Sequence, residues 1–71
     1  MMPLSFAPFG KELVVKKINL DENLTKRLGT LGLLVGSKLI SLSSDGGSLI
    51  LKIKESRLVL NKGIAMKILV D

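Results

Sequence analysis

The stretch Leu28–Gly36, LGTLGLLVG, contains three of the seven glycines of the chain and no charged residue. Three structures are compatible with it: a phosphate-binding loop, a membrane contact, and the end of a helix that turns into a strand. A phosphate-binding loop needs G-x-x-x-x-G-K-[ST] between a strand and a helix, but here Gly32 and Gly36 are one residue too close and Ser37 precedes the lysine. A dinucleotide-binding loop needs G-x-G-x-x-G, which is also absent. The uncharged run is shorter than the roughly 20 residues of a membrane-spanning helix.

The remaining interpretation is that a helix ends inside this stretch. Asp21 is the expected N-cap, because its side chain can accept a hydrogen bond from the first turn. Leucines then follow at a spacing that places them on one helical face: Leu24, Leu28 and Leu31. Gly32 is expected to end the helix in the left-handed conformation, and Gly36 to open the next strand through a second turn. Gly29 lowers helix propensity by about 1 kcal/mol relative to alanine and can allow close packing against the sheet.

The rest of the chain predicts short strands joined by tight turns. The β-branched or alternating segments are 12–19, 36–43, 49–54, 57–60 and 67–70. The turn segments are 44–47, 55–56 and 61–65, the last of which can form one helical turn. On the second strand, Lys38, Ile40 and Leu42 share one face. Short strands with one helix after the first strand favour a mainly β fold, a small antiparallel barrel or sandwich.

The chain of 71 residues is expected to form one domain, 1–71, with residues 1–10 as an extended N-terminal arm. Leu4, Phe6 and Phe9 are expected to pack this arm onto the body. The arm lacks the basic residues of a signal peptide and contains both prolines of the chain, so we expect a cytoplasmic protein.

Composition narrows the classes of function. The chain contains no histidine and no cysteine, which removes the commonest general base, the commonest transition-metal ligand and any disulfide. Its acidic residues are scattered, so we expect no enzymatic activity, no cofactor and no metal site. The net charge of +5 either favours an acidic partner or only keeps the surface soluble. The hydrophobic fraction of 46% is high for a small domain, which indicates exposed apolar surface.

Short motifs follow one another in a specific order along nearly the whole chain. The strongest is R-L-x-x-L-G-L-x-x-G at 27–36. Further elements are Leu4-Ser5 with Gly10 downstream, Gly46-Gly47 ahead of Leu49, Ile50 and Ile53, then L-x-L at 58–60 and A-x-x-I-x-V at 65–70. In this arrangement the chain resembles the FeoA family, small cytosolic proteins of bacterial ferrous iron uptake. It departs from the family at Val35, where the family often has proline.

The resemblance implies an SH3-like β-barrel with a helix inserted after the first strand. It also implies a non-catalytic accessory or regulatory module that binds the cytosolic part of FeoB, a membrane permease with a GTP-binding domain. Such binding would hold the protein at the inner face of the membrane. The same domain occurs at the C-terminus of metal-dependent transcriptional repressors, so a regulatory module of a repressor system is an alternative.

Five residues in and around the glycine-rich stretch are the candidate partner-binding residues: Arg27, Leu33, Leu34, Val35 and Lys38. The three apolar ones crowd where the chain turns, so they form either an exposed docking surface or part of the core. Arg27 either contacts an acidic partner or packs its stem over the core. Lys38 belongs to a basic set that forms either a partner patch or a solvated face.

A small basic barrel that binds nucleic acid is the runner-up function. The charge suits it, but the only aromatic side chains available for stacking are Phe6 and Phe9. No small-molecule substrate is expected, and the apolar surface is compatible with a homo-oligomer. A transporter-binding module should bind a protein domain at moderate salt, whereas nucleic-acid binding should weaken steeply as salt rises.

Overall fold

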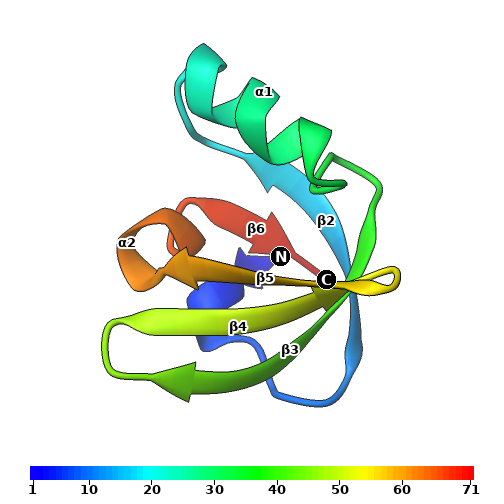
Figure 1. Ribbon diagram of the computed structural model, residues 1–71, viewed down its shortest axis with the longest axis vertical. Helices are drawn as coiled ribbons and strands as arrows, with labels where there is room; N and C mark the ends of the chain where they lie inside the picture. Colours follow the sequence, from blue (N-terminus) through cyan, green and yellow to red (C-terminus); the bar gives the residue numbers. More distant parts are fainter.

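Six short strands and two α-helices make up the structure, a computed structural model that describes residues 1–71 (Figure 1). In chain order the elements are β1 (Met2–Pro3), the 3-10 helix η1 (Leu4–Phe6), β2 (Glu12–Ile18), α1 (Glu22–Thr30), β3 (Lys38–Asp45), β4 (Ser48–Ile53), β5 (Ser56–Asn61), α2 (Lys62–Ala65) and β6 (Ile68–Val70). All strand pairs are antiparallel. This confirms the predicted mainly β fold with a short helix after the first long strand.

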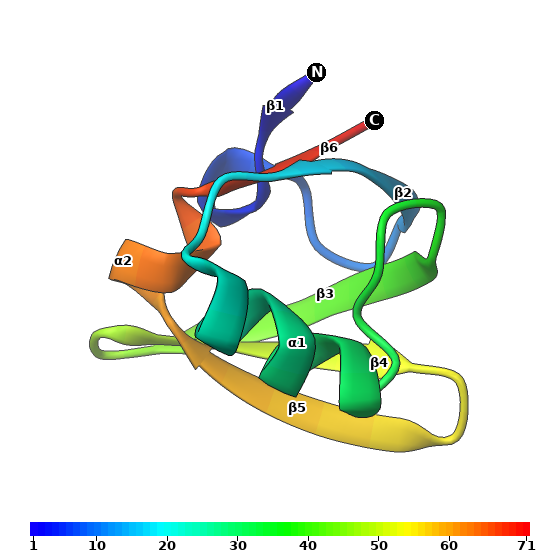
Figure 2. The ribbon, with the colours of Figure 1, turned by 90° about the horizontal axis from the view of Figure 1, so that it is seen from above.

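The sheet has the strand order β1-β6-β2-β3-β4-β5 and curls into a small barrel. The register shifts between Val15 and Lys17 where β2 pairs with β6, and between Ser41 and Ser43 where β3 pairs with β4. Such irregularities bend a strand and increase its twist. Figure 2 shows β1, β6 and β2 on one side of the barrel and β4 and β5 on the other. The end strands β1 and β5 do not pair with each other, and α2, which contacts both β5 and η1, spans the gap.

A cluster of 14 buried hydrophobic side chains fills the barrel. The alternation predicted for β4 is confirmed, because Leu49, Leu51 and Ile53 all point into the core. Helix α1 lies at one end of the molecule (Figure 1) and adds Leu28 to the cluster. The remaining members come from η1, the strands β2 to β6, α2 and the loops after η1 and α1, while Met2 of β1 packs against the cluster from outside. Because folding of so small a domain buries only about 60% of its surface, this aliphatic cluster is the main source of stability.

The N-terminal arm is not extended throughout, contrary to the prediction. Strand β1 pairs with β6, and η1 then turns the chain so that Leu4 and Ala7 face the core. Residues three apart lie on one side of a 3-10 turn, so Leu4 and Ala7 face the core together and Phe6 lies outside, 69% exposed. Phe9, in the segment after η1, is 55% exposed. The predicted packing is therefore confirmed for Leu4 and wrong for both phenylalanines.

The turn between β4 and β5 lies one residue earlier than predicted, at positions 54 and 55. Lys54 has a φ of 55°, the one positive φ outside the glycines. Strand β3 continues to Asp45, so the turn before β4 consists of Gly46 and Gly47 alone. Gly46 has a φ of 60°, which the right-handed twist of a two-residue hairpin requires.

Candidate partner-binding site

Helix α1 ends in a hydrogen-bonded motif that fixes the direction of the following loop. Its N-cap is Asp21, as predicted, whose carboxylate accepts a hydrogen bond of 2.8 Å from the amide of Leu24. At the other end the amide of Leu33 donates to the carbonyl of Leu28 at 3.0 Å, and that of Gly32 to the carbonyl of residue 29 at 3.0 Å. Gly32 has a φ of 95°. This is the Schellman arrangement, and it confirms Gly32 as the residue that ends the helix.

The loop after the helix is tied to itself and to β2. The amide of Ser37 donates to the carbonyl of Leu34 at 2.9 Å across a tight turn in which Gly36 has a φ of 94°. The Ser37 hydroxyl donates to the carbonyl of Gly32 at 2.9 Å and accepts from the amide of Leu34 at 3.1 Å. Backbone bonds of 2.8 and 2.9 Å join Gly36 and Ser37 to Val15. These bonds hold the loop in its conformation and attach it to β2.

Three apolar side chains of this segment face solvent: Leu31 (54% exposed), Leu34 (53%) and Val35 (63%). We call these residues the apolar loop surface. Leu33, also predicted as a partner contact, is fully buried, because the Schellman geometry packs the residue after the left-handed glycine against the last helical turn. The prediction of an exposed apolar segment therefore needs correction: Leu31 takes the place of Leu33.

The two predicted basic contacts lie in different places. Arg27 is exposed in the last turn of α1. Lys38 is exposed at the start of β3 and lines a groove beside the apolar loop surface. Arg27 does not line this groove. Of the two basic residues predicted from the sequence, one therefore lies at the end of α1 and the other in the groove.

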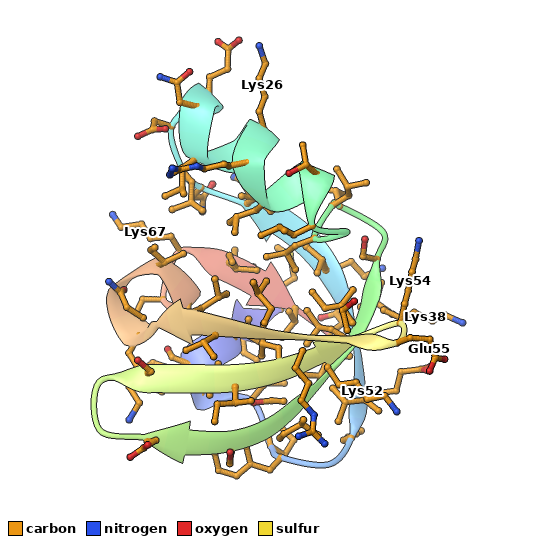
Figure 3. The ribbon with its side chains drawn as sticks, in the orientation of Figure 1. Lys26, Lys38, Lys52, Lys54, Glu55 and Lys67 are labelled. Carbon is orange, nitrogen blue, oxygen red and sulfur yellow. The ribbon has the colours of Figure 1, made fainter.

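The groove has a volume of about 510 Å³ and lies between the loop after α1 and the outer faces of β3 and β4. Its lining residues are Glu12, Gly32, Gly36, Ser37, Lys38, Leu39, Ile40, Lys52, Ile53 and Lys54. Figure 3 shows the side chains of Lys38, Lys52 and Lys54 at the end of the sheet that carries the β4–β5 turn. None of the three forms an ion pair, since the two ion pairs of the structure join Lys26 to Glu22 and the N-terminus to Asp71.

From the sequence, Lys38 was selected as a partner contact, and Lys52 and Lys54 belonged with it to a larger basic set whose members could not be placed relative to one another. Leu39 points inward, so its neighbours Lys38 and Ile40 lie on the outer face of β3. Because Ile40 is directly opposite Lys52 in the β3–β4 ladder, Lys38 and Lys52 lie on the same face of neighbouring strands and line the same groove. The alternation along each strand was visible in the sequence, but the register that joins the strands was not.

No group of three or more histidine, cysteine, aspartate or glutamate side chains is close enough to hold a metal ion. No helix is long and apolar enough to cross a membrane.

Comparisons with known proteins match nearly the whole chain to one family. The model of the FeoA domain matches residues 2–71. A curated protein of Methanocaldococcus jannaschii, named "Putative Fe(2+) transport protein A", is 39% identical over 71 residues, which cover 100% of this chain and 87% of that protein.

Solved structures have the same fold. The crystal structure of an iron uptake regulatory protein (FeoA) superposes with a TM-score of 0.86 at 28% identity, over 99% of this chain and 93% of that one. ScaR with bound Zn2+ superposes with a TM-score of 0.87 at 22% identity, over 100% of this chain but 36% of ScaR. These matches confirm the SH3-like architecture, and the second is a likeness of fold alone.

Proposed function

The chain belongs to the FeoA family, and from that premise we propose that it acts in ferrous iron uptake as a non-catalytic accessory module. In this proposal it binds the cytosolic part of a FeoB-type GTP-dependent permease and thereby lies at the cytoplasmic face of the membrane. The support for a role in ferrous iron uptake comes from the family and from the name of the 39% identical relative.

The observation that carries the docking proposal is the apolar loop surface. Leu31, Leu34 and Val35 are each more than half exposed, although full burial of such a side chain is worth about 1.5–3 kcal/mol. A rigid exposed apolar segment is favourable for binding, because little conformational entropy is lost when a partner covers it. Exposed apolar patches on small proteins commonly mark interaction sites.

Other uses of this fold receive less support from the residues present. SH3 domains that bind proline-rich peptides use a groove lined by aromatic side chains, and the groove here contains none. The likeness to ScaR concerns the fold, and fold alone does not establish function.

The test is a calorimetric titration of the chain against the purified cytosolic region of its cognate ferrous iron transporter, at low and at moderate salt. We expect binding that persists at moderate salt, because burial of Leu34 contributes hydrophobic binding free energy, which salt does not screen. Leu34→Asp should weaken binding about tenfold, since about 1.4 kcal/mol corresponds to a factor of ten. Arg27→Glu should weaken binding mainly at low salt.

Val59→Asp is the matched control, because Val59 is 62% exposed on β5, outside the loop. It should leave the affinity unchanged. Equal effects of the Leu34 and Val59 variants would contradict docking through the loop. Absence of transporter binding, together with binding of a short DNA duplex that disappears with salt, would replace the proposal with the nucleic-acid alternative.

A further inference from the structure

We propose that the groove beside the apolar loop surface binds an acidic peptide segment of the partner, with its carboxylates held by Lys38, Lys52 and Lys54. This inference rests on the proposed function, because it describes the chemistry of the segment that docks there. It adds a second part of the docking site, formed by β3, β4 and the turn after β4.

Three unpaired positive charges line the groove. Lys38, Lys52 and Lys54 come from two strands and a turn, are exposed, and have no anionic partner within ion-pair distance. Like charges that line one groove repel one another, so gathering the three lysines there does not stabilise the isolated protein. Carboxylates in the groove would neutralise this repulsion and form charge-assisted hydrogen bonds with the ammonium groups.

The groove also has an apolar side chain in its floor and bare backbone in its wall. Ile40, half-buried on the outer face of β3, lines the groove, so it can contact an apolar side chain of a bound segment. A β-carbon built on Gly36 would meet no atom within 4 Å, so the wall at this point is bare backbone in open space. An extended main chain can approach such a wall closely.

A carboxylate at one side of the groove favours a peptide over a nucleic acid. Glu12 lies opposite Ile40 in the β2–β3 ladder and lines the groove on the side away from Lys52. A carboxylate there would repel the evenly spaced phosphates of a nucleic acid. A peptide can instead place its acidic residues beside the lysines and a neutral or basic residue beside Glu12. The groove also lacks the aromatic side chains on which bases stack.

The groove is continuous with the loop that carries the apolar loop surface. Gly32, Gly36 and Ser37 line the groove, and Ser37 also holds Leu34 in place through its hydroxyl. The groove and the apolar loop surface therefore share one rigid wall. A single partner segment with apolar residues followed by acidic residues can cover both.

The first experiment titrates the transporter's cytosolic region into the wild-type chain and into Lys38→Gln, Lys52→Gln and Lys54→Gln, over a range of salt concentrations. Each groove variant should weaken binding by about two- to fivefold at low salt and reduce the salt dependence. Lys67→Gln is the matched control, because Lys67 is exposed, lacks an ion pair and lies away from the groove (Figure 3). Equal effects of Lys67→Gln and the groove variants would overturn the groove assignment while leaving transporter binding intact.

The second experiment tests the groove without the transporter. A short acetylated peptide of alternating glutamate and leucine, its glutamine counterpart and a DNA duplex are each titrated into isotope-labelled protein and followed by NMR. Amide shifts confined to residues 36–40 and 52–54 with the glutamate peptide alone, lost in the Lys38→Gln/Lys52→Gln variant, would support the proposal even if the transporter does not bind. Equal shifts with the glutamine peptide, stronger binding of DNA, or no shifts at all would overturn it.

Discussion

Gly29 and Leu34 are in packing contact: a β-carbon at position 29 would lie 2.9 Å from Cδ2 of Leu34. The glycine inside α1 thus accommodates the loop that follows the helix, whereas the sequence left two explanations for it open, close packing against the sheet or a short helix. The contact sets the position of a side chain that is 53% exposed and central to the apolar loop surface. Any residue larger than glycine at this point must move Leu34.

Gly29→Ala should change the shape of the apolar loop surface more than it changes stability. Alanine improves helix propensity by about 1 kcal/mol. The added methyl group displaces the flexible end of Leu34, which offsets part of that gain. We expect the free energy of unfolding in urea to change by less than about 1 kcal/mol, while affinity for the transporter falls severalfold.

The double variant Gly29→Ala/Leu34→Ala provides the control for this contact. With the leucine truncated, the new methyl group meets no obstacle, so relative to Leu34→Ala the double variant should gain the full helix-propensity term of about 1 kcal/mol. The difference between the two backgrounds is the coupling energy of the pair. A coupling energy of zero would show that residues 29 and 34 do not restrict each other in solution.

Gly32→Ala should destabilise the protein by about 1–2 kcal/mol, the cost of a left-handed backbone for an L-residue. Its φ is 95°, and a β-carbon there would be 3.4 Å from Ile53 Cγ2, an ordinary contact. The expected cost is therefore conformational and not steric. Gly47→Ala is the matched control, because Gly47 has no positive φ and open space around it. Similar losses for the two variants in urea unfolding would contradict this explanation.

Local sequence signals predicted most of the fold. The N-cap at Asp21, the left-handed Gly32 and the alternation along β4 each depend on a few adjacent residues, and all three are present. The error at Leu31 has an equally local cause. The helical spacing predicted that Leu31 shares a face with Leu24 and Leu28, but the helix ends before it. In the Schellman arrangement Leu33, not Leu31, packs against the last helical turn.

The groove could not be predicted because it depends on register. Lys38 and Lys52 are far apart in the sequence and meet only because Ile40 pairs with Lys52 after β3 and β4 associate. A shift of one residue would have moved one lysine to the opposite face. The exposure of Phe6 likewise depends on the 3-10 helix η1. The two prolines that flank this helix are compatible with it, but they are equally compatible with an extended arm.

Ser37→Ala should loosen the loop that carries the apolar surface. It removes the bond from the hydroxyl to the Gly32 carbonyl and the bond from the Leu34 amide to the hydroxyl. With about 0.5–1.5 kcal/mol for each of the two bonds, we expect a loss of about 1–3 kcal/mol in the free energy of unfolding. Hydrogen exchange at the Leu34 amide should accelerate.

Thr30→Ala is the control for this variant. The Thr30 hydroxyl makes one exposed bond of 2.7 Å to the Arg27 carbonyl, so its loss should change stability by no more than about 0.5 kcal/mol. Unchanged exchange at the Leu34 amide in the Ser37 variant would mean that the backbone bonds to β2 are sufficient to hold the loop.

Ser41→Ala should stabilise the protein. Ser41 is the one polar residue buried in the core, and its hydroxyl oxygen has no hydrogen-bond partner. A buried hydroxyl without a partner has lost its hydration, at a cost of about 1–3 kcal/mol, and alanine removes that cost with little change in volume. We expect the free energy of unfolding to rise by about 1 kcal/mol, whereas Ser43→Ala, at an exposed position on the same strand, should change it by less than about 0.5 kcal/mol. A loss of stability in the Ser41 variant would show that the hydroxyl is hydrogen-bonded in solution, with a buried water as its partner.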